Sequence, residues 1–286
     1  MFNYSLRARP LSNQENIEDP LIVSVITTTY NSLEFLPRAI LSIQNQTFKE
    51  YEHIIVDDGS DDGTSEYLKS IKDDKIKVII LPRSGRGLAL NTGVDSAIGK
   101  YIAILDADDF SHPARLELQK NVLKDNPHFN LVASDYMISN RDQKTPMNDN
   151  NNMRNINYKV RELKYSDFLI KNPICHSSVM MRKNIFEGIQ KYDESRSELF
   201  DYELWIRFLL SKKIRMCQIS VPLVYRRIHG NQFFERRNRI NYLTQTYLLK
   251  KRLLKTHQGS FYFNIMIILV FMYGLLPRVI RKKFMN

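Results

Sequence analysis

Short runs of apolar and β-branched residues alternate with longer amphipathic stretches along the chain. Four runs predict strands at residues 21–28, 53–56, 77–81 and 101–105. The stretches between them are long enough for crossover helices at residues 32–47, 61–72 and 87–98. Strands and helices that alternate at this spacing predict an α/β fold with a mainly parallel central sheet flanked by helices.

Similar signals continue further along the chain. Strands are predicted at residues 131–137, 176–181 and 218–225, and an amphipathic helix is predicted at residues 201–210. Residues 139–157 are polar and rich in asparagine, so they predict a loop. This loop is either a lid over a substrate or an insertion without a role.

Polar and acidic residues stand where three of the four early strands end. The segments are Thr28-Thr29-Tyr30-Asn31, Asp57-Asp58-Gly59-Ser60 and Asp106-Ala107-Asp108-Asp109. In a parallel sheet these strand ends share one edge, which is where ligands bind in such folds. Five carboxylates would therefore converge there, and they would repel one another unless a cation or a ligand's donors offset their charge.

An oxygen-only cluster of this kind favours a hard divalent cation, Mg²⁺ or Mn²⁺, which carboxylates bind together with substrate phosphates. The alternative for residues 106–109 is a polar loop that caps the helix starting near Ser111. We expect Asp109 to be such a cap. Turn and cap chemistry is also expected for Asp57 and Asp61, ahead of a helix that starts at Thr64.

Composition narrows the class of protein. Hydrophobic residues make up 43% and charged residues 26% of the chain, which is typical of a globular protein that buries a core. The two cysteines, Cys175 and Cys217, form no CxxC pair, so neither a disulfide framework nor a thiolate zinc site is expected. A reducing cytoplasm fits this composition. Residues 1–20 form a polar tail without the apolar core of a signal peptide.

Four segments together resemble those of glycosyltransferase family 2, whose members have the GT-A fold. The segments are residues 23–31, 54–64, 91–109 and 192–205. Their order and spacing make the resemblance specific. It implies a GT-A catalytic domain over residues 21–230, with a nucleotide-sugar half at 21–110 and an acceptor half at 111–230, followed by a helical extension at 231–286.

The resemblance implies roles for the residues at the strand ends. Thr28 and Tyr30 would line the pocket for the nucleotide base, and Asp58 would accept a hydrogen bond from that base, most often uracil. Asp106 and Asp108 look like the DxD motif of the family. Asp106 would contact the ribose or the water shell of the metal. Asp108 would ligate Mg²⁺ or Mn²⁺, which neutralises the departing diphosphate.

The resemblance also implies a base that deprotonates the acceptor hydroxyl. Asp201 stands at that position, but Phe200 replaces the glutamate that usually precedes it. An apolar neighbour partly desolvates a carboxylate and so raises its pKa toward useful basicity. The alternative is that Asp201 only caps its helix. His229 lies where some relatives have a metal or phosphate ligand, with a structural role as the alternative, and His176 is expected to pack on the acceptor side.

Positive charge is concentrated near the end of the chain. Residues 231–286 hold 11 lysines and arginines and one acid, against 31 basic and 30 acidic residues in the rest. One predicted helix here carries an apolar face made of Ile240, Leu243, Tyr247 and Leu254. Basic residues crowd the opposite side of that helix.

An apolar run follows at residues 261–276. As a helix it would extend ~24 Å, short of the ~30 Å hydrocarbon core of a bilayer. We expect it to lie in a membrane interface, where the flanking basic residues suit anionic headgroups, or to dock on protein. Nucleic acid is a less favoured partner, because the segment lacks the stacking aromatic residues of a strand-binding groove.

These inferences lead to one hypothesis and two alternatives. The hypothesis is an inverting, metal-dependent glycosyltransferase, peripheral at the cytoplasmic face of the cell membrane. It would transfer a sugar from a nucleotide-diphosphate sugar, expected to be UDP-linked, to a hydroxyl of a glycan or lipid-linked acceptor in cell-surface polysaccharide synthesis. One alternative is a nucleotide-sugar-binding protein without transferase activity, which Phe200 keeps open. The other is a peripheral polyanion or nucleic-acid binder that uses the basic tail.

Overall fold

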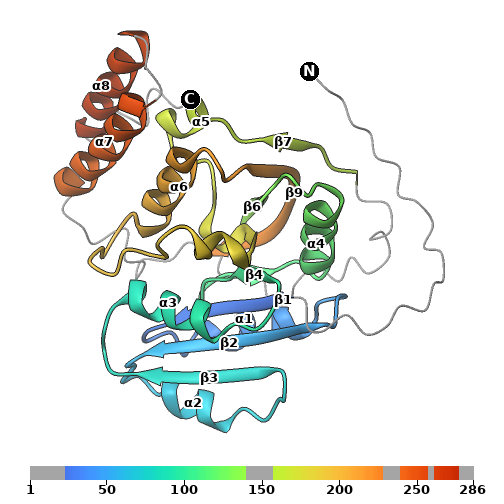
Figure 1. Ribbon diagram of the computed structural model, residues 1–286. Coiled ribbons are helices and arrows are strands. Elements are labelled where there is room, and N and C mark those ends of the chain that lie inside the picture. The colour runs from blue at the N-terminus through green and yellow to red at the C-terminus, as the bar shows by residue number, and fades with distance from the viewer. Residues whose placement is uncertain (1–22, 140–156, 228–238, 257–260, 277–286) are drawn as a thin grey trace.

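The computed structural model describes residues 23–139, 157–227, 239–256 and 261–276 (Figure 1). His229 and nearly all of the predicted loop at residues 139–157 lie outside the described residues.

One nine-stranded sheet runs through the described part of the chain. Its order is β3-β2-β1-β4-β8-β6-β9-β5, and β7 pairs with β9. The strands are β1 (Val23–Thr29), β2 (Tyr51–Asp58), β3 (Ile76–Leu81), β4 (Tyr101–Ile104), β5 (Phe110–Ser111), β6 (Leu131–Ser139), β7 (Val160–Glu162), β8 (Val179–Arg182) and β9 (Met216–Arg227). The first four are parallel to one another, and β6 is parallel to β9. The predicted mainly parallel sheet is therefore confirmed.

Helices cover both faces of this sheet (Figure 1). They are α1 (Leu36–Gln44), α2 (Thr64–Ser70), α3 (Arg86–Ser96), α4 (Arg115–Asp125), α5 (Tyr165–Ile170), α6 (Phe200–Ser211), α7 (Arg239–Thr256) and α8 (Phe261–Leu275). Side chains of α1 and α4 join one buried apolar cluster, and those of α3, α5, α6, α7 and α8 join another. β1, β2 and β4 are covered on both sides and almost fully buried, and apolar or β-branched residues accordingly make up β4, most of β1 and the centre of β2.

The helix α3 packs unusually close to the sheet. A Cβ atom on Gly93 would lie 2.6 Å from Cγ2 of Ile26 in β1, so a larger residue would force the helix away from the strand. Gly93 therefore permits the short distance between α3 and β1.

The predicted strand at residues 176–181 is only partly correct. Residues His176–Ser178 form a 3-10 turn (η2), and the strand β8 starts at Val179. The backbone N–H and the hydroxyl of Ser178 both donate to the carbonyl of Cys175. A serine that bonds to nearby backbone in this way favours a turn over a strand.

The apolar face predicted for α7 is wrong in part. Ile240 is 64% exposed, whereas Lys250 is 3% exposed and its ammonium donates to the carbonyl of Ile170 at 2.8 Å. The rest of the predicted face is confirmed: Leu254 is buried, Tyr247 contacts Phe271 of α8, and Leu243 lies beside Gly274 of α8. Leu249 and Leu253 extend this packing surface, so the buried side of α7 includes Lys250 and omits Ile240. Among the described helices, none has both the length and the apolarity that crossing a membrane requires.

Candidate active site

Three neighbouring strands bring the predicted residues to one edge of the sheet. β1 lies between β2 and β4, and Thr29 at its end is in register with Asp57 of β2. Thr28 is half-buried near the end of β1, and Tyr30 follows as an exposed ring. The strand ends therefore meet as the sequence predicted.

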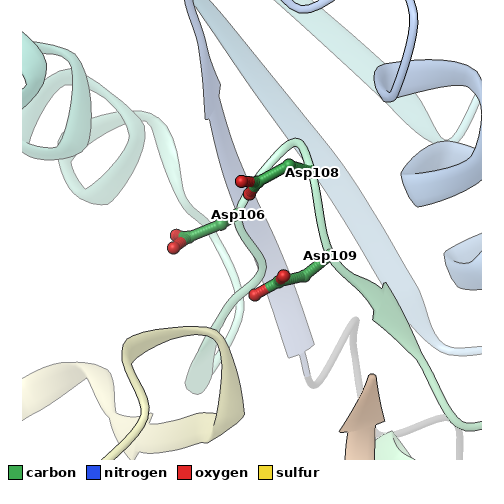
Figure 2. A group of neighbouring side chains, drawn as sticks. All are labelled: Asp106, Asp108 and Asp109. Carbon is green, nitrogen blue, oxygen red and sulfur yellow. The ribbon is translucent and has the colours of Figure 1, made fainter. Parts of the chain in front are cut away.

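Three carboxylates cluster in the loop after β4. One oxygen each of Asp106, Asp108 and Asp109 lies within 4.8 Å of the others, and the side chains project to the same side of the loop (Figure 2). Asp106 and Asp108 are half-buried. Carboxylate oxygens at this spacing fit a hard divalent cation, since such ions accept oxygen ligands from the protein, substrate phosphates and water.

Asp109 is not a helix cap, which corrects our expectation. Its side chain is buried, and it accepts hydrogen bonds from the Ser177 hydroxyl at 2.6 Å and the Arg227 backbone N–H at 3.0 Å. The N-cap of α4 is Ala114. Burial, together with the charges of Asp108 and Asp106, raises the pKa of Asp109 well above its usual value. A cation beside the cluster would offset this repulsion.

Asp106 is held by two side chains. The Arg86 guanidinium donates to its Oδ1 at 2.5 Å, and Nδ1 of His176 lies 3.2 Å from the same oxygen. Burial would raise the pKa of Asp106, but Arg86 and His176 outweigh it and hold this pKa well below the usual range. Asp106 is therefore ionised and oriented by the protein.

His176 packs against the rings of Phe200 and Trp205 in α6, in line with the predicted packing role, and it also belongs to a buried chain of hydrogen bonds. Its Nε2 lies 3.0 Å from the Tyr192 hydroxyl, and the Tyr192 backbone exchanges hydrogen bonds with the Asn91 side chain in α3. Since an ionised Asp106 can only accept, His176 donates to it from Nδ1, and the Tyr192 hydroxyl bonds to the other ring nitrogen, Nε2. This chain fixes both the imidazole and the carboxylate.

Arg86 connects the acidic cluster with the predicted base. Its guanidinium lies 4.7 Å over the ring of Phe200, the residue before Asp201. Burial opposes the charge of Arg86, but Asp106, with smaller contributions from Asp108 and Asp201, raises the pKa of Arg86 overall. Asp201 and the acidic cluster thus lie within electrostatic reach of the same guanidinium.

Asp201 lies in the first turn of α6, half-buried, and accepts a hydrogen bond from Asn172 Nδ2 at 2.9 Å. The N-cap of this helix is Leu199, two residues before Asp201, and no side-chain capping bond is made there. Leu199 has a left-handed backbone, with φ of 54°, although its side chain is buried. Such a conformation costs roughly 1–3 kcal/mol in a non-glycine residue and is found at sites where the surroundings fix it.

The predicted base-binding residues form a second cluster. The Asp58 carboxylate is buried and accepts hydrogen bonds from the Arg83 guanidinium and from the backbone N–H groups of Ser84, at 2.7 Å, and Gly85, at 2.9 Å. The Arg83 guanidinium also lies 3.6 Å over the ring of Tyr30. Arg83 thus contacts both Tyr30 and Asp58 and links the two side chains.

Turn chemistry is confirmed for Asp57 but takes a different form for Asp61. Asp57 accepts hydrogen bonds from the hydroxyls of Ser60 and Ser65. Asp61 instead accepts a hydrogen bond from the Asn31 side chain. At the start of α2, the backbone N–H of Thr64 donates to Asp62. These acids organise the loop and do not line the acidic cluster.

Sequence reasoning gave no role to four residues that the structure brings to this site. They are Arg83, Arg86, Asn172 and Tyr192. Tyr192 stands in a segment that carried the family resemblance, so the sequence did offer a reason to consider it as a site residue. The other three act through contacts with residues 20 to 29 positions away, for which the local pattern has no signature.

Comparison with known proteins agrees with this architecture. The family model described as "Glycosyl transferase family 2" matches residues 24–189. The chain is 36% identical over 199 residues to an uncharacterized glycosyltransferase of Methanocaldococcus jannaschii, which covers 66% of this chain and 65% of that protein. It is 32% identical over 222 residues to one of Rickettsia prowazekii, with coverage of 77% and 67%. The chain therefore spans about two thirds of the length of these curated relatives.

Solved structures share the fold at low sequence identity. The crystal structure of S. aureus TarS 1-349 in complex with UDP-GlcNAc matches with a TM-score of 0.66 and 17% identity, over 88% of this chain and 72% of that chain. The full TarS crystal structure matches with a TM-score of 0.63 over 90% of this chain and 44% of that one. The architecture is accordingly the GT-A fold that the resemblance implied.

Proposed function

Because this chain belongs to glycosyltransferase family 2, we propose that it is an inverting, metal-dependent glycosyltransferase. It transfers a sugar from a nucleotide-diphosphate sugar to a hydroxyl of a glycan or lipid-linked acceptor. In this proposal residues 21–110 bind the donor and residues 111–230 bind the acceptor. One observation carries it: Arg86 pairs with Asp106 in the acidic cluster while its guanidinium covers Phe200, next to Asp201. The donor and acceptor groups of a transfer reaction would then be adjacent.

The proposed donor is UDP-linked. The bound UDP-GlcNAc in the TarS complex, which shares this fold, supports a uridine nucleotide. Tyr30, just after β1, offers an exposed ring on which a pyrimidine stacks, with Thr28 near the end of that strand. Asp58 offers a carboxylate that accepts a hydrogen bond from the base, in competition with Arg83. The proposed contact of Asp106 is the ribose or the water shell of the metal.

Asp108 is the proposed protein ligand of Mg²⁺ or Mn²⁺, with Asp106 and Asp109 beside it. When bound, the cation supplies Lewis-acid stabilisation of the leaving diphosphate. Arg86 adds a fixed positive charge at the same place, and the hydrogen bonds to Asp106 and Asp109 keep the cluster in shape. His229 remains a proposed additional ligand from outside the described residues.

Asp201 is the proposed general base. Asn172 donates to its Oδ2 and so restrains the carboxylate, and in this proposal Oδ1 accepts the proton of the acceptor hydroxyl. The base takes the hydroxyl proton as the oxygen attacks the anomeric carbon, and the nucleoside diphosphate leaves on the opposite face. Attack opposite to the leaving group inverts the configuration of the sugar.

The proposed setting is cell-surface polysaccharide synthesis at the cytoplasmic face of the cell membrane. Two observations support it: the basic segment at residues 231–286, and the two cysteines, which are free thiols and not a disulfide.

The test uses purified protein, Mn²⁺ and a set of nucleotide sugars, with a membrane extract as the source of acceptor. Metal-dependent thermal stabilisation reports donor binding, and release of UDP reports transfer. We expect Asp201→Asn to keep donor binding and to lower UDP release by about 10²-fold or more, the usual contribution of a general base. The matched control is Asp95→Asn, which removes an exposed acid paired with Lys191.

The outcomes separate the alternatives. Unchanged UDP release in Asp201→Asn would remove Asp201 from the role of base. Donor binding by the wild type without any UDP release would support a binding protein in place of an enzyme. If no nucleotide sugar stabilises the wild type in the presence of metal, the proposal is wrong.

A further inference from the structure

The helix α8 has two contrasting faces. Its inner face packs on protein: Phe263 meets Tyr165 of α5 with ring centroids 6.0 Å apart, and Phe271 meets Tyr247 of α7 at 5.5 Å. Gly274 is buried, and a Cβ atom there would lie 2.5 Å from a methyl group of Leu243. The helix is therefore fixed in orientation by α5 and α7.

The other side of α8, here called the α8 outer face, is exposed and apolar. Its side chains range from 37% exposed at Tyr273 to 82% exposed at Phe261. The members are Phe261, Tyr262, Ile265, Ile268, Leu269, Met272, Tyr273 and Leu275. A contiguous apolar surface of this kind marks an interaction site, since leaving it in water is costly.

Charge decides which partner fits the α8 outer face. Residues 231–286 carry 11 basic residues and one acid, and the exposed Lys251 and Lys255 lie on α7 beside α8. A second copy of the chain would bring two such basic segments together, and their like charges would repel. Nucleic acid would find basic residues but an apolar contact surface without a strand-binding groove. An anionic bilayer complements both the charge and the apolar face.

We propose that the α8 outer face docks in the interface of an anionic lipid bilayer, with the helix lying along the membrane plane. The helix of 15 residues is about 22 Å long, shorter than a hydrocarbon core of about 30 Å, which agrees with lying in the interface. The flanking lysines contact headgroups while the apolar side chains enter the acyl boundary.

Docking at α8 would hold the acceptor side of the site close to the membrane. α7 packs between α8 and α6 (Figure 1), and its Asn241 donates to Glu198 at 2.9 Å, just before the start of α6. Burial, and then the charge of Asp201, raises the pKa of Tyr242 in α7 to about 12, so this helix borders the predicted base. This consequence rests on the proposed function. An acceptor side held close to the bilayer favours a lipid-linked acceptor over a free glycan.

The experiment is flotation of the full-length chain with vesicles of phosphatidylcholine mixed with phosphatidylglycerol, and with vesicles of pure phosphatidylcholine. We expect binding to the anionic vesicles only. The double variant Leu269→Gln with Met272→Gln should bind at least about tenfold more weakly, because it removes two exposed apolar side chains. Lys251→Gln with Lys255→Gln should weaken binding to anionic vesicles by about tenfold.

The control is Ile98→Gln, which replaces a comparably exposed apolar residue between α3 and β4 and should bind like the wild type. Thermal unfolding checks that each variant folds. Absence of vesicle binding by the wild type, or binding unaffected by both double variants, would overturn the proposal. A dimer that Leu269→Gln with Met272→Gln dissociates, without vesicle binding, would overturn it in favour of a second copy. UDP release measured on the same samples reports the proposed function separately, since vesicle binding needs no catalysis.

Discussion

Nδ1 of His176 lies 3.2 Å from Oδ1 of Asp106, across 70 positions of sequence. The imidazole is itself held through Nε2 by the Tyr192 hydroxyl at 3.0 Å. A carboxylate next to a metal site is commonly oriented by such outer partners, which contribute to affinity without touching the ligand. His176 and Tyr192 are therefore positioning residues for Asp106.

Tyr192→Phe should weaken metal-dependent donor binding by about tenfold, because the His176 imidazole loses the hydroxyl that holds it in place. Titration of Mn²⁺ in the presence of UDP, followed by thermal stabilisation, measures this. The matched control is Tyr202→Phe, which also removes a buried hydroxyl, but one that donates to the Phe168 carbonyl. Equal losses of metal affinity in the two variants would contradict the positioning role.

Asp108→Asn should abolish metal-dependent stabilisation by UDP, because it removes the charged oxygen that we assign to the cation. Asp109→Asn should have a smaller effect on metal affinity, within about tenfold. Both carboxylate oxygens of Asp109 already accept hydrogen bonds, from the Ser177 hydroxyl and the Arg227 backbone N–H, so we expect this side chain to contribute less to the cation than Asp108 does. Isothermal titration with Mn²⁺ compares the two variants, and a larger loss at Asp109 than at Asp108 would reverse the assignment.

Tyr30→Ala should raise the dissociation constant for UDP about 10- to 100-fold, since stacking of a base on an aromatic ring contributes roughly 1–3 kcal/mol. Tyr30→Phe keeps the ring and should bind UDP like the wild type. Calorimetry with UDP measures both. Equal affinity of Tyr30→Ala and the wild type would exclude stacking on this residue.

The buried His53 should lower the free energy of unfolding in acid. It is fully buried in β2, its Nε2 lies 2.9 Å from the Thr27 hydroxyl, and burial lowers its pKa from 6.5 to about 3. Between these values the unfolded chain binds the proton and the folded protein does not, so the free energy of unfolding falls as the pH drops below 6.5. By pH 5 the loss is about 2 kcal/mol from this residue.

Urea unfolding of the wild type and of His53→Gln at pH 7 and pH 5 measures this contribution as a difference. The variant should lose less stability on acidification than the wild type. His128→Gln, at an exposed histidine, is the control and should follow the wild type. Identical acid dependence of all three proteins would show that His53 carries no such linkage.

Most of the sheet could be predicted because its strands are buried on both faces. β1, β4 and the centre of β2 appear in the sequence as apolar, β-branched runs, and polar residues mark where these strands end: Tyr30-Asn31 after β1, Asp57-Asp58 at the end of β2, and Asp106 shortly after β4. The short strands β5 and β7 gave no such signal, since two or three residues are too few for a hydrophobic period. They exist because β9 offers them a pairing edge.

From the local pattern alone, the candidate site was predictable only where acids stand at or just after the end of a strand, as Asp58, Asp106 and Asp108 do. Asp201, in the first turn of α6, was expected from the family resemblance. Arg86 and Asn172 are ordinary polar residues in their local context, and their importance comes from the folded contacts with Asp106 and Asp201. The role of Asp109 was misjudged for the same reason: its partners, Ser177 and Arg227, come from distant segments.

Two consecutive residues, Gly85 and Arg86, bind the carboxylates of two different strand ends. The Gly85 N–H donates to Asp58 and the Arg86 guanidinium donates to Asp106. Because one peptide unit joins these bonds, we expect a displacement at one carboxylate to be transmitted to the other. Substitutions at Asp58 and Asp106 should then be non-additive, and a substitution at Asp58 that changes the proposed binding of the base should also alter the acidic cluster.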